Sequence, residues 1–257
     1  MGILNVTPDS FSDGGLFTNT DSALCQAEQM CIDGAQVIDI GGESTRPGAS
    51  PVSISEELDR VIPIIEKIHQ TLDVVISIDS CKAEVMTSAA KAGAGLINDV
   101  MALQAEGALK AAQETGLPVC LMHMQGEPRV MQQNPQYADV VHEVKDFLMR
   151  RVEQCLQQGF TKNQLIIDPG FGFGKTLAHN IKLFKALEQF TTLEVPVLVG
   201  ASRKSMIGQI TGKETAQRLS GSLALATLAV TKGAAIIRVH DVAETVDAIK
   251  VALALSE

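Results

Sequence analysis

Short apolar runs alternate with longer amphipathic stretches along the whole chain. The runs are rich in β-branched residues and apolar on both faces, which is typical of parallel strands covered by helices. We predict strands at 2–5, 36–40, 74–78, 96–99, 119–123, 165–168, 197–200 and 236–239, with helical patterns at 55–70, 83–92, 137–158, 181–189 and 216–232. Eight strand–helix units in 257 residues favour one (β/α)8 TIM-barrel domain over residues 1–257, rather than an open doubly wound sheet.

Capping residues and composition refine three of the helices. A helix is predicted after Asn19-Thr20-Asp21, and Ser53 with Glu56 gives the capping-box pattern before another. The stretch 221–230 is rich in Ala and Leu, so it predicts a helix packed on both sides. One side of this helix would pack on the barrel, and the other side would pack either on the barrel or on another subunit. The second alternative suggests a homodimer.

Composition narrows the possible partners and the compartment. The formal net charge of −9 argues against nucleic acid, which needs a basic surface. No apolar run reaches the ~18 residues that cross a membrane, and Asn5, Pro8 and Asp9 interrupt any signal-peptide pattern. The five cysteines form no CxxC pair, which favours thiols in a reducing compartment. We expect a cytoplasmic protein that acts on small molecules and contacts no membrane.

Polar residues occur at the carboxyl end of every predicted strand. In a barrel these ends meet on one face, where active sites lie, so we predict one shared site. Its candidate residues, in chain order, are Asn5, Asp39, Asp79, Asn98, Met122 with His123, Asp168, Ser202 with Lys204, and Arg238 with His240.

Several common catalytic motifs are absent from the sequence. Gly174-Lys175-Thr176 resembles the end of a phosphate loop, but Pro169 stands where the first glycine is required. The glycines at 170–174 do not complete GxGxxG, no HExxH occurs, and Ser202 does not lie in a nucleophile elbow. Chemistry that uses a nucleophilic serine or a protease-type metal is therefore disfavoured.

The remaining polar groups are suited to binding and polarising a substrate. Asp79, Asn98 and Asp168 suit a flat heterocycle, because a carboxylate can accept two parallel bonds from an amino-pyrimidinone edge. Asp79 could instead cap the next helix, and Asp168 could serve the turn at Pro169. The cations suit a polyphosphate leaving group or, alternatively, are ordinary surface charges, Arg203 above all. They are Arg46, Arg203, Lys204, Arg238 and His240.

The roles of one further stretch and of one histidine are predicted less directly. The long, glycine-containing stretch 7–20 predicts a mobile loop that closes over substrate. His123 either touches the site or is a hydrogen-bonded core histidine, and the second interpretation is slightly favoured.

Over nearly its whole length the chain resembles the dihydropteroate synthase family. The most specific motifs are ILNVTPDSFSDGG at 3–15 and GGESTRPG at 41–48, supported by IDS at 78–80, IND at 97–99, DPGFGFGK at 168–175, SRK at 202–204 and RVHD at 238–241. The resemblance implies condensation of 6-hydroxymethyl-7,8-dihydropterin diphosphate with p-aminobenzoate, releasing pyrophosphate in a Mg²⁺-assisted step of folate biosynthesis. Sulfonamides would compete with the amine.

The resemblance also implies a role for each matching residue. The pterin would contact Asp79, Asn98, Met122, Asp168, Phe173, Lys204 and Arg238. The diphosphate would contact Arg46, Arg238, His240 and Asn5, with Asn5 also near Mg²⁺. The p-aminobenzoate or sulfonamide pocket would be formed by Phe11, Thr45, Pro47, Phe173, Ser202 and Lys204. A dissociative route is expected, with Asp13 stabilising the cation, and Arg46, Lys204, Arg238 and His240 are the other predicted catalytic residues.

Two alternative functions remain open, and the sequence differs from the usual family pattern at its N-terminus. A pterin-binding methyltransferase would share the Asp and Asn contacts but would not need the motifs at 9–15 and 44–47. A non-catalytic pterin-binding paralogue would have lost loop or diphosphate residues, and none is lost. Members of the family usually carry a short N-terminal hairpin under the barrel, so we expect that a restored upstream segment would raise the melting temperature.

Overall fold

The structure is a computed structural model that describes residues 1–6, 16–44, 50–126 and 130–255, with backbone alone at 16–19. Eight parallel strands occur in these ranges: β1 (Gly2–Asn5), β2 (Val37–Gly41), β3 (Val75–Asp79), β4 (Leu96–Asp99), β5 (Val119–Met122), β6 (Leu165–Asp168), β7 (Leu198–Val199) and β8 (Ile236–Ile237). Strands β1 to β6 pair in sequence order, and β7 pairs with β8.

Parallel bridges join these two sheets at both seams. Gly2 bridges to Val239 and Ile167 bridges to Val197, with backbone hydrogen bonds of 2.9 Å from Ile3 to Val239 and 3.0 Å from Ile167 to Pro196. The eight strands therefore surround a common centre, and the predicted (β/α)8 barrel is confirmed.

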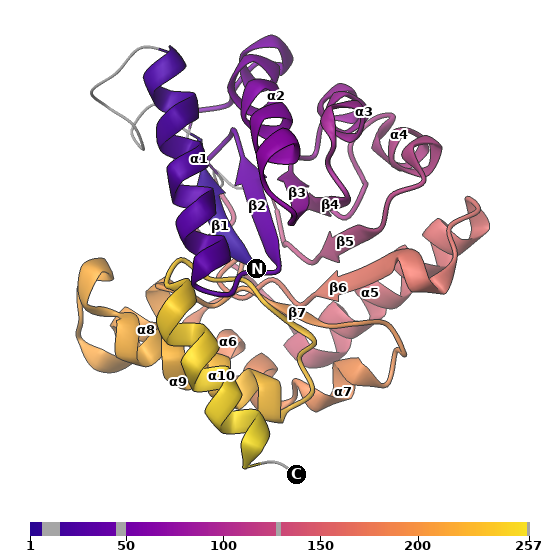
Figure 1. Cartoon of the computed structure of the whole chain (residues 1–257). Coiled ribbons are helices and arrows are strands. Elements are labelled where there is room, and N and C mark those ends of the chain that lie inside the picture. Colours follow the sequence, from indigo (N-terminus) through magenta and orange to yellow (C-terminus); the bar gives the residue numbers. More distant parts are fainter. Residues whose placement is uncertain (7–15, 45–49, 127–129, 256–257) are drawn as a thin grey trace.

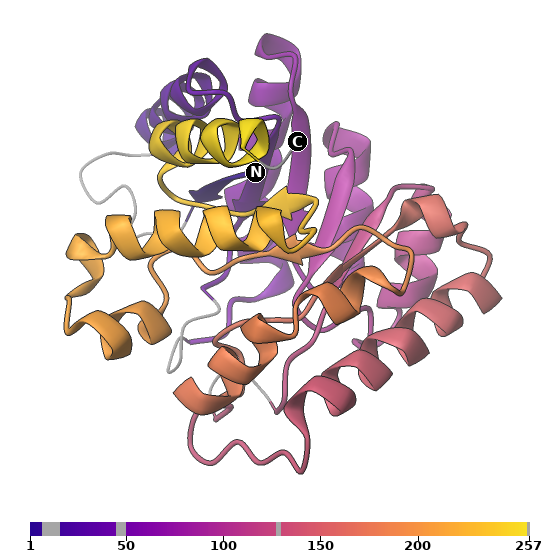
Figure 2. The ribbon, with the colours of Figure 1, turned by 90° about the horizontal axis from the view of Figure 1, so that it is seen from below.

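The helices form the outer layer around the strands, as Figures 1 and 2 show. They are α1 (Leu16–Ile32), α2 (Ile54–Thr71), α3 (Ala83–Ala92), α4 (Ala108–Thr115), α5 (Val140–Gln157), α6 (Leu177–Lys185), α7 (Glu188–Thr191), α8 (Ser205–Thr211), α9 (Leu219–Thr231) and α10 (Val242–Ala254). The side-chain oxygen of Ser53 accepts a hydrogen bond from the backbone of Glu56 at 3.2 Å, which confirms the predicted start of α2.

Two predicted helix boundaries were wrong. Helix α1 begins at Leu16, so Asn19-Thr20-Asp21 lies inside it rather than before it. The helix predicted at 181–189 is two helices, α6 and α7, and α6 begins at Leu177 because the hydroxyl of Thr176 accepts a bond from the backbone of His179 at 3.2 Å.

The core lies both inside the barrel and between the strands and helices. Ile38, Ile40, Ile76 and Ile78 are fully or almost fully buried on one face of β2 and β3, and Asp39 and Ser77 are fully buried on the other, as expected for a sheet covered on both sides. This packing fixes the strand ends, which carry the predicted site residues.

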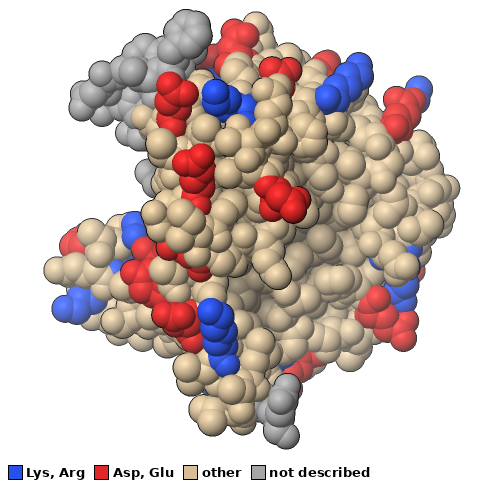
Figure 3. All heavy atoms as spheres, viewed as in Figure 1, with Lys and Arg blue, Asp and Glu red and all other residues tan. Residues whose placement is uncertain are grey.

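The face of the molecule drawn in Figure 3 agrees with the negative net charge of the chain. Figure 3 shows acidic side chains interspersed with basic ones there, without a continuous basic area. Within the described residues, no helix is both long and apolar enough to span a membrane.

Candidate active site

The carboxyl ends of the strands bring a set of polar side chains around one small pocket. Asp79 ends β3, Asn98 is its neighbour in β4, and Asp168 ends β6. The pocket is lined by Asp79, Asn98, Val100, Met122, Asp168, Phe173, Gly200, Lys204 and Arg238. Except for Val100 and Gly200, these are the residues whose pterin contacts the sequence predicts, and the structure places them together.

Arg238 connects two carboxylates beneath this pocket. Its Nε donates to Oδ2 of Asp39 at 2.6 Å and its Nη2 donates to Oδ2 of Asp79 at 2.7 Å. Nδ2 of Asn98 also donates to Oδ2 of Asp39, at 3.1 Å. Asp39 is fully buried, and its Oδ1 has no hydrogen-bond partner among the described residues. Asp39 therefore orients two predicted site residues, a role the sequence did not assign to it.

The ionisable groups of the pocket have strongly shifted pKa values. Burial raises the pKa of Asp79 to about 7, although the Arg238 guanidinium acts against this rise. Burial likewise raises the pKa of Asp168, with Lys204 opposing, and lowers the pKa of Lys204 to about 8. Burial alone would lower the pKa of Arg238, but the carboxylates of Asp39, Asp79 and Asp168 together outweigh burial and raise it. Asp79 and Lys204 thus change charge near neutral pH, as is common in active sites.

The buried side chain of Lys175 forms hydrogen bonds with the backbone of the loop between β6 and α6. Lys175 is 3 % exposed, and its Nζ donates to the carbonyls of Gly170 at 2.8 Å and Phe173 at 3.0 Å. It also lies 2.9 Å from Nδ1 of His123. Burial lowers the pKa of His123 to about 2, so its ring is the neutral acceptor. His123 does not line the pocket, which agrees with the favoured interpretation as a core histidine.

The same loop positions an aromatic wall of the pocket. Gly170 has φ +69°, and a Cβ there would overlap the carbonyl oxygen of His123, so only glycine fits this turn. Nζ of Lys204 donates to the carbonyl of Phe171 and lies 4.3 Å from the centroid of the Phe173 ring. Lys204 and Phe173 therefore face the pocket as a cation–π pair.

Other predicted residues lie at neighbouring strand ends. The backbone N–H of His240 donates to Oγ of Ser202 at 3.2 Å, and Nδ1 of its ring is 3.1 Å from the same oxygen. Arg203 donates through Nε to Asp241 at 2.9 Å, which agrees with a structural charge rather than a substrate contact. Asn5 ends β1 and is exposed.

Five predicted residues cannot be placed. Phe11, Asp13, Thr45, Arg46 and Pro47 lie outside the described residues, as does most of the predicted loop at 7–20. Their assignments remain predictions.

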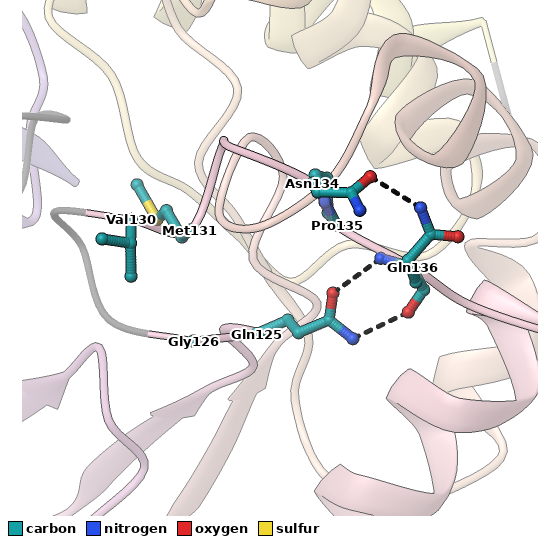
Figure 4. Close-up of a pocket in the computed structure, with 7 residues that line it drawn as sticks. All are labelled: Gln125, Gly126, Val130, Met131, Asn134, Pro135 and Gln136. Atoms are coloured by element: carbon teal, nitrogen blue, oxygen red, sulfur yellow. Dashed lines mark hydrogen bonds between the residues drawn. The ribbon is translucent and has the colours of Figure 1, made fainter.

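A second hollow, of about 280 Å³, lies beside the segment that follows β5. Figure 4 shows Gln125 and Gln136 facing each other there: Nε2 of Gln125 donates to the Gln136 carbonyl at 2.8 Å, and the Gln136 N–H donates back at 3.1 Å. Among the described residues, its lining contains no charged side chain.

Sequence comparison links this geometry to known proteins. Residues 1–240 match the family described as pterin binding enzyme. The dihydropteroate synthase of Escherichia coli (strain K12) is 55% identical over 251 residues, which span 98% of this chain and 89% of that protein. The chain belongs to the dihydropteroate synthase family.

Solved structures of dihydropteroate synthases have the same fold. The Yersinia pestis enzyme in a sulfonamide drug complex superposes with a TM-score of 0.95 and 55% identity, covering 99% of this chain and 93% of the other. The Xanthomonas albilineans enzyme in complex with 7,8-dihydropteroate gives a TM-score of 0.90 and 47% identity, covering 99% and 92%. Members of this family are transferases, so the chain is an enzyme of that class.

Proposed function

We propose that this chain, as one pterin-binding barrel domain over residues 1–257, joins 6-hydroxymethyl-7,8-dihydropterin diphosphate to p-aminobenzoate and releases pyrophosphate. The observation that carries the proposal is the convergence of Asp79, Asn98 and Asp168 on one small pocket. Together they offer hydrogen-bond acceptors and an amide at the positions where a flat amino-pyrimidinone can be recognised along its edges.

The pterin fills the pocket between polar and apolar walls. The carboxylates of Asp79 and Asp168 accept its N–H groups, and Asn98 both donates and accepts. Met122 and Phe173 cover its faces. Lys204 lies between Asp168 and Phe173, so its ammonium reaches the ring acceptors, and Arg238 packs against the ring while keeping its contact with Asp39.

The diphosphate lies over the cationic side of the pocket. Arg238 and His240 neutralise it, with Arg46 and Asn5 as further ligands. Mg²⁺ prefers oxygen ligands and usually keeps several waters beside substrate phosphates, and the amide oxygen of the exposed Asn5 would supply one such ligand. When bound, Mg²⁺ would supply charge neutralisation that makes the diphosphate a better leaving group.

The reaction proceeds by departure of the diphosphate before the amine attacks. The C–O bond breaks with both electrons leaving on the diphosphate, and the electron-rich dihydropterin delocalises the positive charge of the methylene. Asp13 stabilises that cation. The aniline nitrogen, neutral at pH 7, then forms the C–N bond and loses a proton to water. Its pocket is built by Phe11, Thr45, Pro47, Phe173, Ser202 and Lys204.

We further propose an assembly and a compartment for the chain. Helices α9 and α10 pack against each other, and each exposes large apolar side chains, among them Leu228 and Leu253. Exposed apolar surface of this kind supports a homodimer, which sedimentation velocity would test. The five free cysteines support a reducing, cytoplasmic location.

Pyrophosphate release tests the proposal directly. Purified protein receives the dihydropterin diphosphate, Mg²⁺ and p-aminobenzoate, with and without a sulfonamide. We expect release that requires the amine and is suppressed by the drug. The variant Asp168→Asn should lose most of this activity, whereas the exposed Asp73→Asn should keep it.

Two results would overturn the assignment. Folded protein that binds the pterin but releases no pyrophosphate would point to a non-catalytic paralogue. Pterin binding together with methyl transfer to a corrinoid acceptor would point to the methyltransferase.

A further inference from the structure

The turn that follows β4 holds two consecutive non-glycine residues in the left-handed backbone region. Ala102 has φ +53° and Leu103 has φ +58°, and both residues are buried. A residue with a side chain is strained there, because its Cβ comes too close to the following carbonyl oxygen. Such strain persists only where the surrounding contacts determine the backbone conformation. The contacts that hold this turn therefore need to be identified.

The carboxylate of Asp99 binds the turn from its start. Its Oδ1 accepts a hydrogen bond from the backbone N–H of Met101, and its Oδ2 accepts one from the N–H of Leu103, both at 2.7 Å. The carbonyl of Asp99 also accepts a bond from the N–H of Ala102, at 3.0 Å. Three consecutive N–H groups of the turn are thus bonded to one residue, which is itself fully buried.

Arg151 of helix α5 binds the carbonyl groups of the same two strained residues. Its Nε donates to the carbonyl of Ala102 at 2.7 Å, and its Nη2 donates to the carbonyl of Leu103 at 3.1 Å. A guanidinium presents its donors in a rigid planar fork, so it can bond two neighbouring carbonyls at once. Arg151 is buried as well. The strained turn is therefore held between an acidic side chain from β4 and a basic one from α5.

The turn lies directly beside the pterin pocket. Asn98 precedes Asp99 and Val100 follows it, and both of these neighbours line the pocket, whereas Asp99 and Arg151 do not. A turn that relaxed out of the left-handed conformation would free the backbone immediately after Asn98. The conformation of residues 102 and 103 is thus coupled to the position of two side chains that face the pterin.

The carboxylate of Asp99 is ionised at slightly basic pH. Burial raises its pKa to about 6, although the bonds from Met101 and Leu103 and the charge of Arg151 oppose this rise. The ionised form is an acceptor at both oxygens, as the two N–H bonds require. Assays at pH 8 therefore measure the protein with this turn intact.

We propose that Asp99 and Arg151 are positioning residues for the pterin. They hold Ala102 and Leu103 in the left-handed conformation, and this conformation keeps the pocket-lining residues on either side of Asp99 in place. Neither positioning residue touches the substrate. The inference rests on the proposed function, because the pterin is the substrate named there.

A glycine substitution separates positioning from a general loss of stability. Arg151→Met removes both bonds to the turn, and Asp99→Asn removes the charged acceptor. Ala102→Gly is then added to Arg151→Met, because glycine adopts positive φ without strain. The matched controls are Arg150→Met, an exposed neighbour in α5, and Ala105→Gly added to Arg151→Met, in the same loop but outside the left-handed region.

Each variant is measured at pH 8 by calorimetry for the Kd of the dihydropterin diphosphate, without amine, and by urea unfolding. We expect Arg151→Met and Asp99→Asn to raise the Kd about tenfold, as when only about a tenth of the molecules keep the turn. Ala102→Gly should return the Kd of Arg151→Met to within about threefold of the wild type, and Ala105→Gly should not. Arg150→Met should bind as the wild type does. A merely structural role would lower the urea midpoint without distinguishing the two glycines.

The possible failures are distinguishable. The positioning role is overturned by an unchanged Kd in the folded variants, or by a glycine at 102 that recovers no more affinity than one at 105. If Arg151→Met does not fold, Arg151→Lys, which keeps the charge but lacks the planar fork, carries the same comparison. A wild type that binds the pterin diphosphate but releases no pyrophosphate overturns the proposed reaction alone, and one that binds no pterin overturns both.

Discussion

Replacing Asp79 with asparagine should stabilise the empty enzyme at pH 8 while weakening its binding of pterin. The pKa of Asp79 is raised from 3.8 to about 7, first by burial. The unfolded chain therefore gives up this proton at lower pH than the folded chain does. Stability falls as the pH rises from about 4 through about 7, and the ionised carboxylate is a net cost above that range.

The size of the effect follows from the shift and from the contact that is lost. A rise of about three units corresponds to ~4 kcal/mol at 1.36 kcal/mol per unit, as an upper bound for a carboxylate paired with Arg238. Asparagine can still accept a hydrogen bond from Nη2 of Arg238, but this bond no longer has a charged acceptor and is weaker. The net stabilisation is therefore smaller than the upper bound. We expect a net gain of about 1–2 kcal/mol at pH 8, or roughly 2–8 °C in melting temperature for a chain of this size.

Urea unfolding and thermal melts at pH 5 and pH 8 measure this prediction. The advantage of Asp79→Asn should shrink to zero or reverse at pH 5, where the wild-type side chain is protonated. Pterin affinity should fall about 10- to 100-fold, since buried donors of the ligand lose a charged acceptor. Asp73→Asn, exposed before the same strand, should change neither quantity. A variant that is less stable than the wild type at pH 8, or equally stabilised at both pH values, would refute the reasoning.

Three further predictions concern the same site. The value of kcat/KM for the pterin diphosphate should rise as the pH passes about 7, because Asp79 ionises, and should fall above about pH 8, because Lys204 loses its proton. The variant Lys204→Arg should move this fall to higher pH. Gly170→Ala should cost several kcal/mol more in urea unfolding than Gly212→Ala, because both have φ near +70° but only the first Cβ is blocked, and positive φ alone costs about 1–2 kcal/mol. Arg238→Met should cost about 3–5 kcal/mol at pH 8 by leaving buried carboxylates uncompensated, and equal stability would contradict this.

The barrel and its pocket were predictable because both depend on local patterns. Apolar runs with intervening amphipathic stretches specify parallel strands and covering helices, and barrel topology brings every strand end to one face. Asp79, Asn98 and Asp168 could therefore be grouped without knowing any distance between them. The pocket that they line also contains Met122 and Phe173, which only the family resemblance had placed with them.

The supporting residues could not be predicted, because their partners are distant in the sequence. Asp39 contacts Arg238 across 199 positions, and Lys175 contacts His123 across 52. A charged residue inside an apolar run, as Asp39 is between Ile38 and Ile40, was the available signal. It indicates a buried partner without saying which one.

The stability predictions for Asp79 and Arg238 have opposite signs for one physical reason. Among the described residues, the carboxylates of Asp39, Asp79, Asp99 and Asp168 outnumber the nearby cations of Lys175, Lys204 and Arg238. Removing a carboxylate relieves this excess, and removing a cation aggravates it. Pterin N–H donors satisfy the same acceptors, so the empty site is destabilised by the groups that bind substrate. If both substitutions stabilised the protein, packing rather than charge would determine its stability there, and the raised pKa of Asp79 would need another cause.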